Sequence, residues 1–242
     1  MLPPRTLIVS DGGLVGLLAC ALAREGVLAY DGPEPQRLSM PLLWIPRFRC
    51  SLGTGALRAA ALERHAELLA LTPARSEFEV EAESLLGEAP ASEAEDIAHE
   101  RAPSLAGARA LLDACQDAGV LECSRVVWAC TATDHEGRVR SDALARVLNR
   151  ALLVARLAGV EGVTLDVHTP VADLAMSRVA DLVQDLGVPV EEAWWSRALE
   201  GAMNSTAHIA HTGPISVARE AIERARAIRG QWAPVLDGLV RA

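Results

Sequence analysis

The chain has no lysine, because all 23 of its basic residues are arginine. No lysine amine is therefore present to neutralise a phosphate or to act as a nucleophile. Aromatic residues make up only 3% of the chain, so the hydrophobic core must be built from Leu, Val and Ala. The net charge is −9, which argues against nucleic acid as a main partner, since the phosphate backbone attracts basic surfaces.

The chain also lacks long apolar runs and paired cysteines. No run approaches the roughly 18 apolar residues that a membrane-spanning helix needs, so no membrane partner is expected. The five cysteines are scattered, and none forms a C-x-x-C pair. An odd cysteine count without a signal peptide predicts reduced thiols and a cytoplasmic protein. Half of the 242 residues are hydrophobic, which suffices for one large domain or one domain with a small extension.

Strand-like and helix-like segments alternate along the chain. The expected strands cover residues 6–10, 26–30, 42–45, 78–80, 125–130 and 163–167. The expected helices cover residues 14–25, 55–71, 104–117 (with Ser104 as a cap), 141–157, 171–186 and 215–229. This alternation is typical of an α/β fold with a mostly parallel twisted sheet and helices on both faces. Residues 81–103 break the pattern, and their acidic composition predicts a solvated excursion.

Right-handed crossovers bring the carboxyl ends of parallel strands to one edge of the sheet. The Gly12-Gly13 turn, Asp31, the loop at residues 131–142 and the segment His168-Thr169-Pro170 each follow an expected strand or lie at its end. We therefore expect these four segments to lie along one edge, where α/β proteins bind their ligands.

Residues 6–22 read TLIVS-DGGLVG-LLACAL, an apolar run that meets two glycines and then a helical pattern. A helix that begins at such a turn offers an anion site, because free N–H groups and the helix dipole point at it. The segment resembles the S-G-G-x-D-S loop of PP-loop ATP pyrophosphatases, although Asp11, Val15 and Gly16 replace its Ser, Asp and Ser. The candidate nucleotide-binding residues are Ser10, Asp11, Gly12, Gly13, Leu14, Val15, Gly16 and Asp31. An ordinary tight turn is the alternative interpretation of the two glycines alone.

The later part of the chain resembles one family of that superfamily, the 7-cyano-7-deazaguanine synthases. Asp134 and Gly137 match the family's D-Y-S-G-Y-P-D-C-R motif, whereas the other residues of that loop do not. Further matches to its H-T-P, D-L, L-G-V-P and W-S elements are His168, Thr169, Pro170, Asp173, Leu174, Leu186, Gly187, Val188, Pro189, Trp195 and Ser196.

The resemblance implies an adenine nucleotide alpha-hydrolase-like domain over residues 1–190, a C-terminal helical extension over residues 191–242, and a homodimer. Members of the family use ATP and Mg²⁺ to activate a carboxylate, release pyrophosphate and make a nitrile in queuosine biosynthesis. They also carry a zinc ion held by four cysteines. By the same resemblance, the substrate-pocket candidates are Asp134, Gly137, His168 and Thr169.

The chain differs from the family at the positions of the zinc-binding cysteines and of a lysine. Residues 212–218 read TGPISVA in place of the cysteine motif C-G-x-C-x-x-C, so we expect no zinc. Met176 stands where the family has a lysine. We therefore expect weak ATP–Mg²⁺ binding and a degenerate, non-catalytic or altered-activity protein that binds a nucleotide or a deazapurine. The alternatives are an active ATP-dependent C–N ligase that forms AMP and pyrophosphate, and an interaction or structural subunit.

Asp11 is expected to cap the helix that follows the glycines, accepting a hydrogen bond from the N–H of Gly13 or Leu14. A carboxylate of the chain itself would then occupy the place of a bound anion and repel a triphosphate.

Four other features have less specific interpretations. His208 and His211 have the spacing of a metal pair but no third ligand nearby, and Asp134-His135-Glu136 is either a general acid/base or a polar turn. Trp194-Trp195 either stacks on a purine or packs against the C-terminal helix, and Cys130 shows no sign of a reactive thiolate.

Overall fold

The computed structural model describes residues 5–26, 41–49, 54–81, 85, 102–134, 136–160, 162–205 and 215–239. Within them, five strands form one sheet in the order β3-β2-β1-β4-β5, and every neighbouring pair is parallel. The strands are β1 (Arg5–Val9), β2 (Leu42–Arg49), β3 (Thr72–Glu81), β4 (Cys123–Trp128) and β5 (Asp166–His168).

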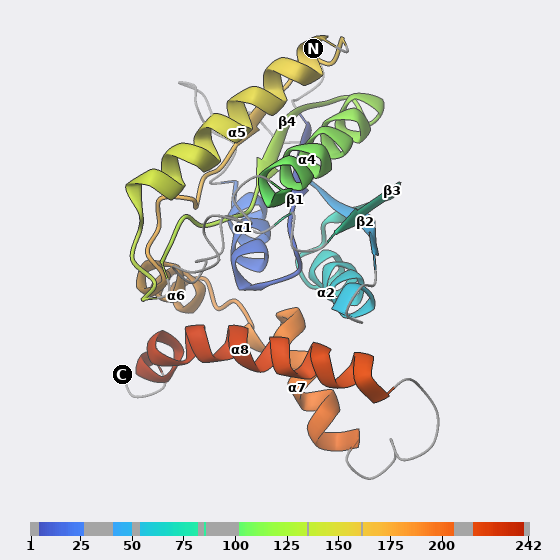
Figure 1. The fold of residues 1–242 in the computed structure, drawn as a ribbon. Helices are drawn as coiled ribbons and strands as arrows, with labels where there is room; N and C mark the ends of the chain where they lie inside the picture. The colour runs from blue at the N-terminus through green and yellow to red at the C-terminus, as the bar shows by residue number, and fades with distance from the viewer. Residues whose placement is uncertain are drawn as a thin grey trace.

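Helices cover both faces of this sheet (Figure 1). Helices α4 (Ala102–Val120) and α5 (Ser141–Val160) pack on one face. The other face carries α1 (Leu14–Arg24), α2 (Thr54–Leu68), α6 (Met176–Asp185), the 3₁₀ turn η3 (Val190–Glu192), α7 (Trp194–Ser205) and α8 (Ile215–Leu239). The expected α/β class, with a parallel sheet between two helical layers and further helices at its C-terminal end, is therefore confirmed.

Strand β1 shows why the sheet has two hydrophobic cores. Its side chains alternate, so Leu7 and Val9 join the core under α4 and α5, whereas Ile8 joins the core under α1. All three side chains are fully buried, as expected for a central strand of a parallel sheet. Helix α1 is buried on nearly every side, because the sheet lies on one side of it and the elements that follow α5 cover the other.

The chain changes direction beside β1. It runs from β1 outward through β2 to β3, and then returns to place β4 on the other side of β1. Parallel α/β proteins bind ligands at the carboxyl ends of strands beside such a reversal, which is called a topological switch point. Residues 10–13 follow β1 and residues 129–134 follow β4, so both loops lie at this switch point.

The boundaries of several elements differ from the sequence-based expectation. Strand β5 begins at Asp166 rather than at residue 163, and α6 begins at Met176 rather than at residue 171. Hydrogen-bonded turns fill the gap before α6, since the N–H groups of Ala172 and Leu174 bind carbonyls three residues earlier. Helix α4 starts at Ala102, so Ser104 lies inside the helix and is not its cap. The expected strand at 26–30 and the excursion at 81–103 lie largely outside the described residues.

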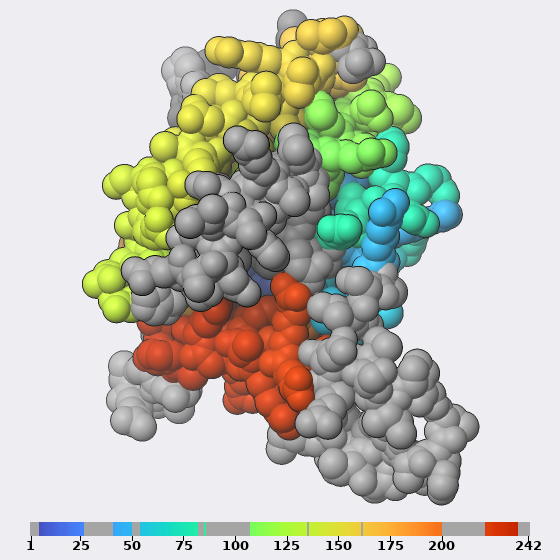
Figure 2. Space-filling view, viewed as in Figure 1, coloured from blue at the N-terminus to red at the C-terminus, as the bar shows by residue number. Residues whose placement is uncertain are grey.

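The C-terminal helices belong to the same core as α1. Trp194 and Trp195 of α7 and Trp232 of α8 are buried in that core, which confirms the packing interpretation of the tryptophan pair. Helices α5 and α8 form broad parts of the surface in the space-filling view (Figure 2). None of the helices in the described part of the chain combines the length and hydropathy needed to cross a membrane.

Candidate functional site

The glycine turn after β1 has the backbone geometry that only glycine accepts easily. Gly12 has a φ of +81°, and a Cβ at this position would lie 3.0 Å from the carbonyl oxygen of Arg58. The N–H of Gly12 donates to Ser10 Oγ at 3.0 Å. The Ser10 hydroxyl therefore closes the turn, and the turn can pack tightly against α2 because Gly12 has no side chain.

Asp11 directly precedes Gly12 and places a carboxylate beside the turn. Its Oδ1 accepts a hydrogen bond from the N–H of Gly13 at 2.9 Å, as expected from the sequence, and the residue is only 6% exposed. The expectation that Asp11 is the N-cap is wrong, because Gly13 occupies that position with an extended backbone and no side-chain cap. Asp11 precedes the cap, and its carboxylate turns back onto the loop.

Arg58 of α2 completes the charge balance of the loop, and sequence reasoning missed it. Its Nη1 lies 2.6 Å from Asp11 Oδ2 and also donates to the main-chain oxygen of Asp11 at 3.1 Å. The guanidinium carbon lies 4.2 Å from the centre of the Trp194 ring. One signal could have revealed it: Arg58, Leu62 and His65 have the i, i+4, i+7 spacing of one helix face, and that face is buried.

The start of α7 closes the site from the other side. The backbone N–H of Trp194 donates to the Gly12 carbonyl at 3.1 Å. The N-termini of α1 and α7 therefore both lie beside the loop, and Arg58 contacts Asp11 before α1 and Trp194 at the start of α7. This arrangement joins residue 12 directly to residue 194.

The first turn of α1 contains the remaining loop candidates, Leu14, Val15 and Gly16. Leu14 and Val15 pack in the hydrophobic core and offer no polar side chain to a ligand. A Cβ at position 16 would overlap Ser10 Oγ and lie 2.6 Å from Ser10 Cβ. Ser10 thus takes the space of the second hydroxyl-bearing side chain in the S-G-G-x-D-S loop. Asp31 lies outside the described residues.

The loop after β4 lies on the other side of the switch point. The N–H of Ala129 donates to the carbonyl of Val9 at 2.9 Å, which holds the two strand ends together. Cys130 follows and is buried, and burial raises the pKa of its thiol, so no thiolate forms there at neutral pH.

The Asp134 carboxylate binds groups of its own loop. Its Oδ1 accepts hydrogen bonds from the N–H groups of Glu136 and Arg138, each at 2.9 Å, and its Oδ2 pairs with the Arg138 guanidinium at 3.1 Å. The backbone hydrogen bond from Arg138 is the main reason that the pKa of Asp134 is lowered. A carboxylate held ionised in this way favours the polar-turn interpretation over a general acid.

Gly137 and Met176 meet where α6 begins. Gly137 has a φ of +76°, its carbonyl accepts the Met176 N–H at 2.9 Å, and a Cβ at 137 would lie 2.9 Å from Met176 Cβ. Met176, which stands where the family has a lysine, packs under this loop and is 7% exposed. His168 ends β5 and Thr169 follows it, so both lie at the carboxyl edge of the sheet with the other candidates.

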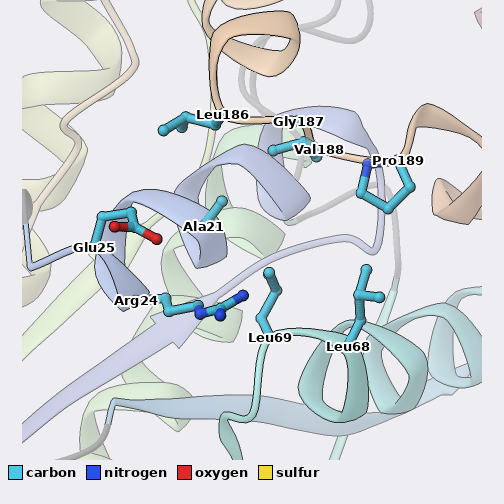
Figure 3. A pocket seen from close by; sticks show the side chains of 9 residues that line it. All are labelled: Ala21, Arg24, Glu25, Leu68, Leu69, Leu186, Gly187, Val188 and Pro189. Atoms are coloured by element: carbon cyan, nitrogen blue, oxygen red, sulfur yellow. The ribbon is translucent and has the colours of Figure 1, made fainter.

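A hollow among the described residues lies away from the glycine turn. It has a volume of about 230 Å³ and is lined by Ala21, Arg24, Glu25, Leu68, Leu69, Leu186, Gly187, Val188 and Pro189 (Figure 3). These residues come from the C-terminal ends of α1 and α2 and from the segment after α6. The hollow therefore lies at the opposite end of α1 from the glycine turn.

The glycine loop does not fit an ATP phosphate as it stands, because the Asp11 carboxylate occupies the Gly13 N–H and pairs with Arg58 Nη1. Among the described residues, no group of three or more His, Cys, Asp or Glu side chains is placed to hold a metal ion. Residues 206–214, which include His208, His211 and the start of the segment aligned with the zinc motif, lie outside the described part, as does His135.

Comparisons with known proteins leave the family open. No family model matches the sequence, and no curated protein matches it either. Among solved structures, the chain is similar to the U34-tRNA thiolase NcsA from Methanococcus maripaludis, described with its [4Fe-4S] cluster. The TM-score is 0.47 at 11% identity, and the alignment covers 100% of this chain and 73% of that chain. At that score and identity, the likeness assigns neither a family nor a reaction to this chain.

Proposed function

We propose that this chain is a non-catalytic protein of the PP-loop type, similar to the deazaguanine synthases, that binds a small nucleoside-like or deazapurine ligand without turning over ATP. The observation that carries the proposal is the closed loop: the Asp11 carboxylate binds the Gly13 N–H and pairs with buried Arg58. The strand order supports the ligand-binding part, because ligands of α/β proteins bind at the switch point beside β1 and β4.

The carboxylate acts on ATP in two ways. It takes a backbone donor that a phosphate oxygen would need, and it engages Arg58 Nη1, a charged donor that a phosphate oxygen could otherwise use. The chain has no lysine to supply another cation, and Met176 packs in the core where the resembled family has one. Both effects lower the affinity for a triphosphate more than the affinity for an uncharged nucleoside.

The test combines a melting assay with a turnover assay on the full chain. Adenosine, AMP, ATP–Mg²⁺ and a deazapurine carboxylate are each titrated, and pyrophosphate release from ATP is measured. A ligand at about 100 times its Kd stabilises a protein by about 2.7 kcal/mol, which gives a measurable shift in Tm. We expect a shift with the nucleoside or the deazapurine and no release of pyrophosphate. Pyrophosphate release with a carboxylate substrate would establish the active ligase instead, and no shift with any ligand would favour an interaction subunit.

A variant isolates the role of the loop carboxylate. Asp11→Ser frees the Gly13 N–H and removes the carboxylate partner of Arg58 Nη1, which keeps its bond to the main-chain oxygen of residue 11, so we expect tighter ATP–Mg²⁺ binding than in the wild type. Asp173→Ser is the matched control, because it removes one negative charge from an exposed position after β5. Equal ATP affinities in the two variants would contradict the blocking role of Asp11.

A further inference from the structure

Three buried N–H-bearing nitrogens at the glycine loop have no acceptor. Arg58 and Trp194 are almost fully buried, at 0% and 1% exposure. No hydrogen-bond partner lies near Arg58 Nε, Arg58 Nη2 or Trp194 Nε1, and solvent does not reach these atoms. Buried donors are nearly always hydrogen-bonded, and those of a charged group are especially costly to leave unpaired. Each of these groups therefore requires an acceptor.

The orientation of the guanidinium indicates what kind of acceptor fits. Asp11 contacts only Nη1, so the Nε–Nη2 edge is left unused. That edge carries two parallel N–H bonds, the arrangement that binds a carboxylate or a phosphate through two oxygens. The third unpartnered donor is the indole N–H of Trp194, the residue on whose ring the guanidinium stacks.

The local charges favour one further negative charge. The Arg58 and Asp11 charges cancel, whereas the N-termini of α1 and α7 each contribute about half a positive charge. The other ionisable groups nearby do not alter this balance. Burial lowers the pKa of His65, which keeps its ring neutral, and the Glu192 carboxylate is taken by Arg197 at 2.8 Å and 3.0 Å.

We propose that the unused Nε–Nη2 edge of Arg58, together with the indole N–H of Trp194, binds a small oxyanion, either a carboxylate or a single phosphate group. The site lies between the starts of α1 and α7, and it is distinct from the Gly13 N–H that Asp11 occupies. Because both side chains are covered, the bound group must be small. The inference deepens the proposed function by giving the ligand one anionic group, and it holds for a free anion as well.

The test titrates sodium phosphate and sodium acetate into the full-length protein at constant ionic strength, with sodium chloride as the reference. Melting shifts and calorimetric Kd values are measured for the wild type, Trp194→Phe and Arg58→Lys. Trp194→Phe keeps the stacked ring and removes the indole N–H, so we expect about tenfold weaker binding. Arg58→Lys keeps the charge and loses the two-pronged edge, so we expect binding to disappear. Trp195→Phe, at a buried neighbour with no orphaned donor, is expected to bind like the wild type.

The outcomes separate the sources of the anion and the two proposals. Tighter binding of phosphate assigns a phosphoryl group, and tighter binding of acetate assigns a carboxylate. If neither anion shifts the wild-type Tm relative to chloride, or if Trp194→Phe binds like the wild type, the inference is overturned and water must satisfy these donors. Pyrophosphate release from ATP would overturn the proposed function alone, because it does not depend on binding of these small anions.

Discussion

Removing one partner of the Asp11–Arg58 pair should destabilise the fold strongly. The side chains are 9% and 0% exposed, so solvent screens the pair little, and the Nη1–Oδ2 distance is 2.6 Å. Breaking a buried pair leaves an uncompensated charge and costs about 3–5 kcal/mol. For a chain of this size, each 1 kcal/mol lowers the Tm by about 2–4 °C, so Arg58→Met should lower it by roughly 6–20 °C.

A double-mutant cycle tests the cause of that loss. In Asp11→Asn/Arg58→Met both charges are gone, and the Asn oxygen still accepts the Gly13 N–H. We expect the double variant to be more stable than the sum of the single changes predicts, by about 2 kcal/mol. The free energies of unfolding are measured by urea denaturation, with two optical probes to check two-state behaviour.

An exposed ion pair provides the reference for this cycle. Arg75 and Glu63 lie 2.8 Å apart with side chains that are 68% and 36% exposed, so their coupling should stay below about 1 kcal/mol. If the coupling of Asp11 with Arg58 is no larger than that of this pair, the loop is not held by a buried charge pair and the reasoning fails.

Two further predictions concern neighbours of the pair. Gly16→Ala should destabilise the protein by about 1–3 kcal/mol, because its Cβ would overlap Ser10, whereas Gly159→Ala in α5 meets nothing within 4 Å and should be neutral or stabilising. Equal effects on urea denaturation would contradict the crowding argument. Burial lowers the pKa of His65 from its ordinary 6.5, with smaller opposing effects from Glu192 and Asp11, so the unfolded chain binds the proton first as the pH falls. Stability should therefore decline below about pH 6.5, and His65→Gln should reduce the decline in Tm between pH 7.5 and 5.5. An unchanged pH profile in that variant would assign the decline to other groups.

The layered fold could be predicted because its signals are local. Apolar runs of strand length, helical periodicity and glycines at the turns fixed the order of β1, α1, β2 and α2 to within a few residues. The start of α6 was misplaced, because the apolar residues Val171 and Leu174 fit a helical pattern although the chain forms turns there. The sequence pattern does not predict the bounds of α7, because its residues are expected only as part of a helical extension over residues 191–242.

The candidate site was predictable only in its backbone. The glycine turn and the bond from Gly13 to Asp11 follow from residues adjacent in sequence. Arg58 lies 47 residues from Asp11, and Trp194 lies farther still, so no spacing rule connects them. The spacing of Arg58, Leu62 and His65 suggests a shared helix face, but it does not show that Trp194 of α7 covers the arginine.

The contact of Trp194 with Gly12 has a consequence for the order in which the molecule forms. The loop is synthesised well before α7, yet its geometry depends on that helix, which begins about 180 residues later. Strand β1 likewise pairs with β4, which is made later, and the core around α1 is complete only when Trp232 of α8 has been made. Such long-range contacts slow folding. Until α7 emerges, the nascent chain carries Arg58 without its aromatic cover, so the glycine loop reaches its final geometry only long after its own residues have been made.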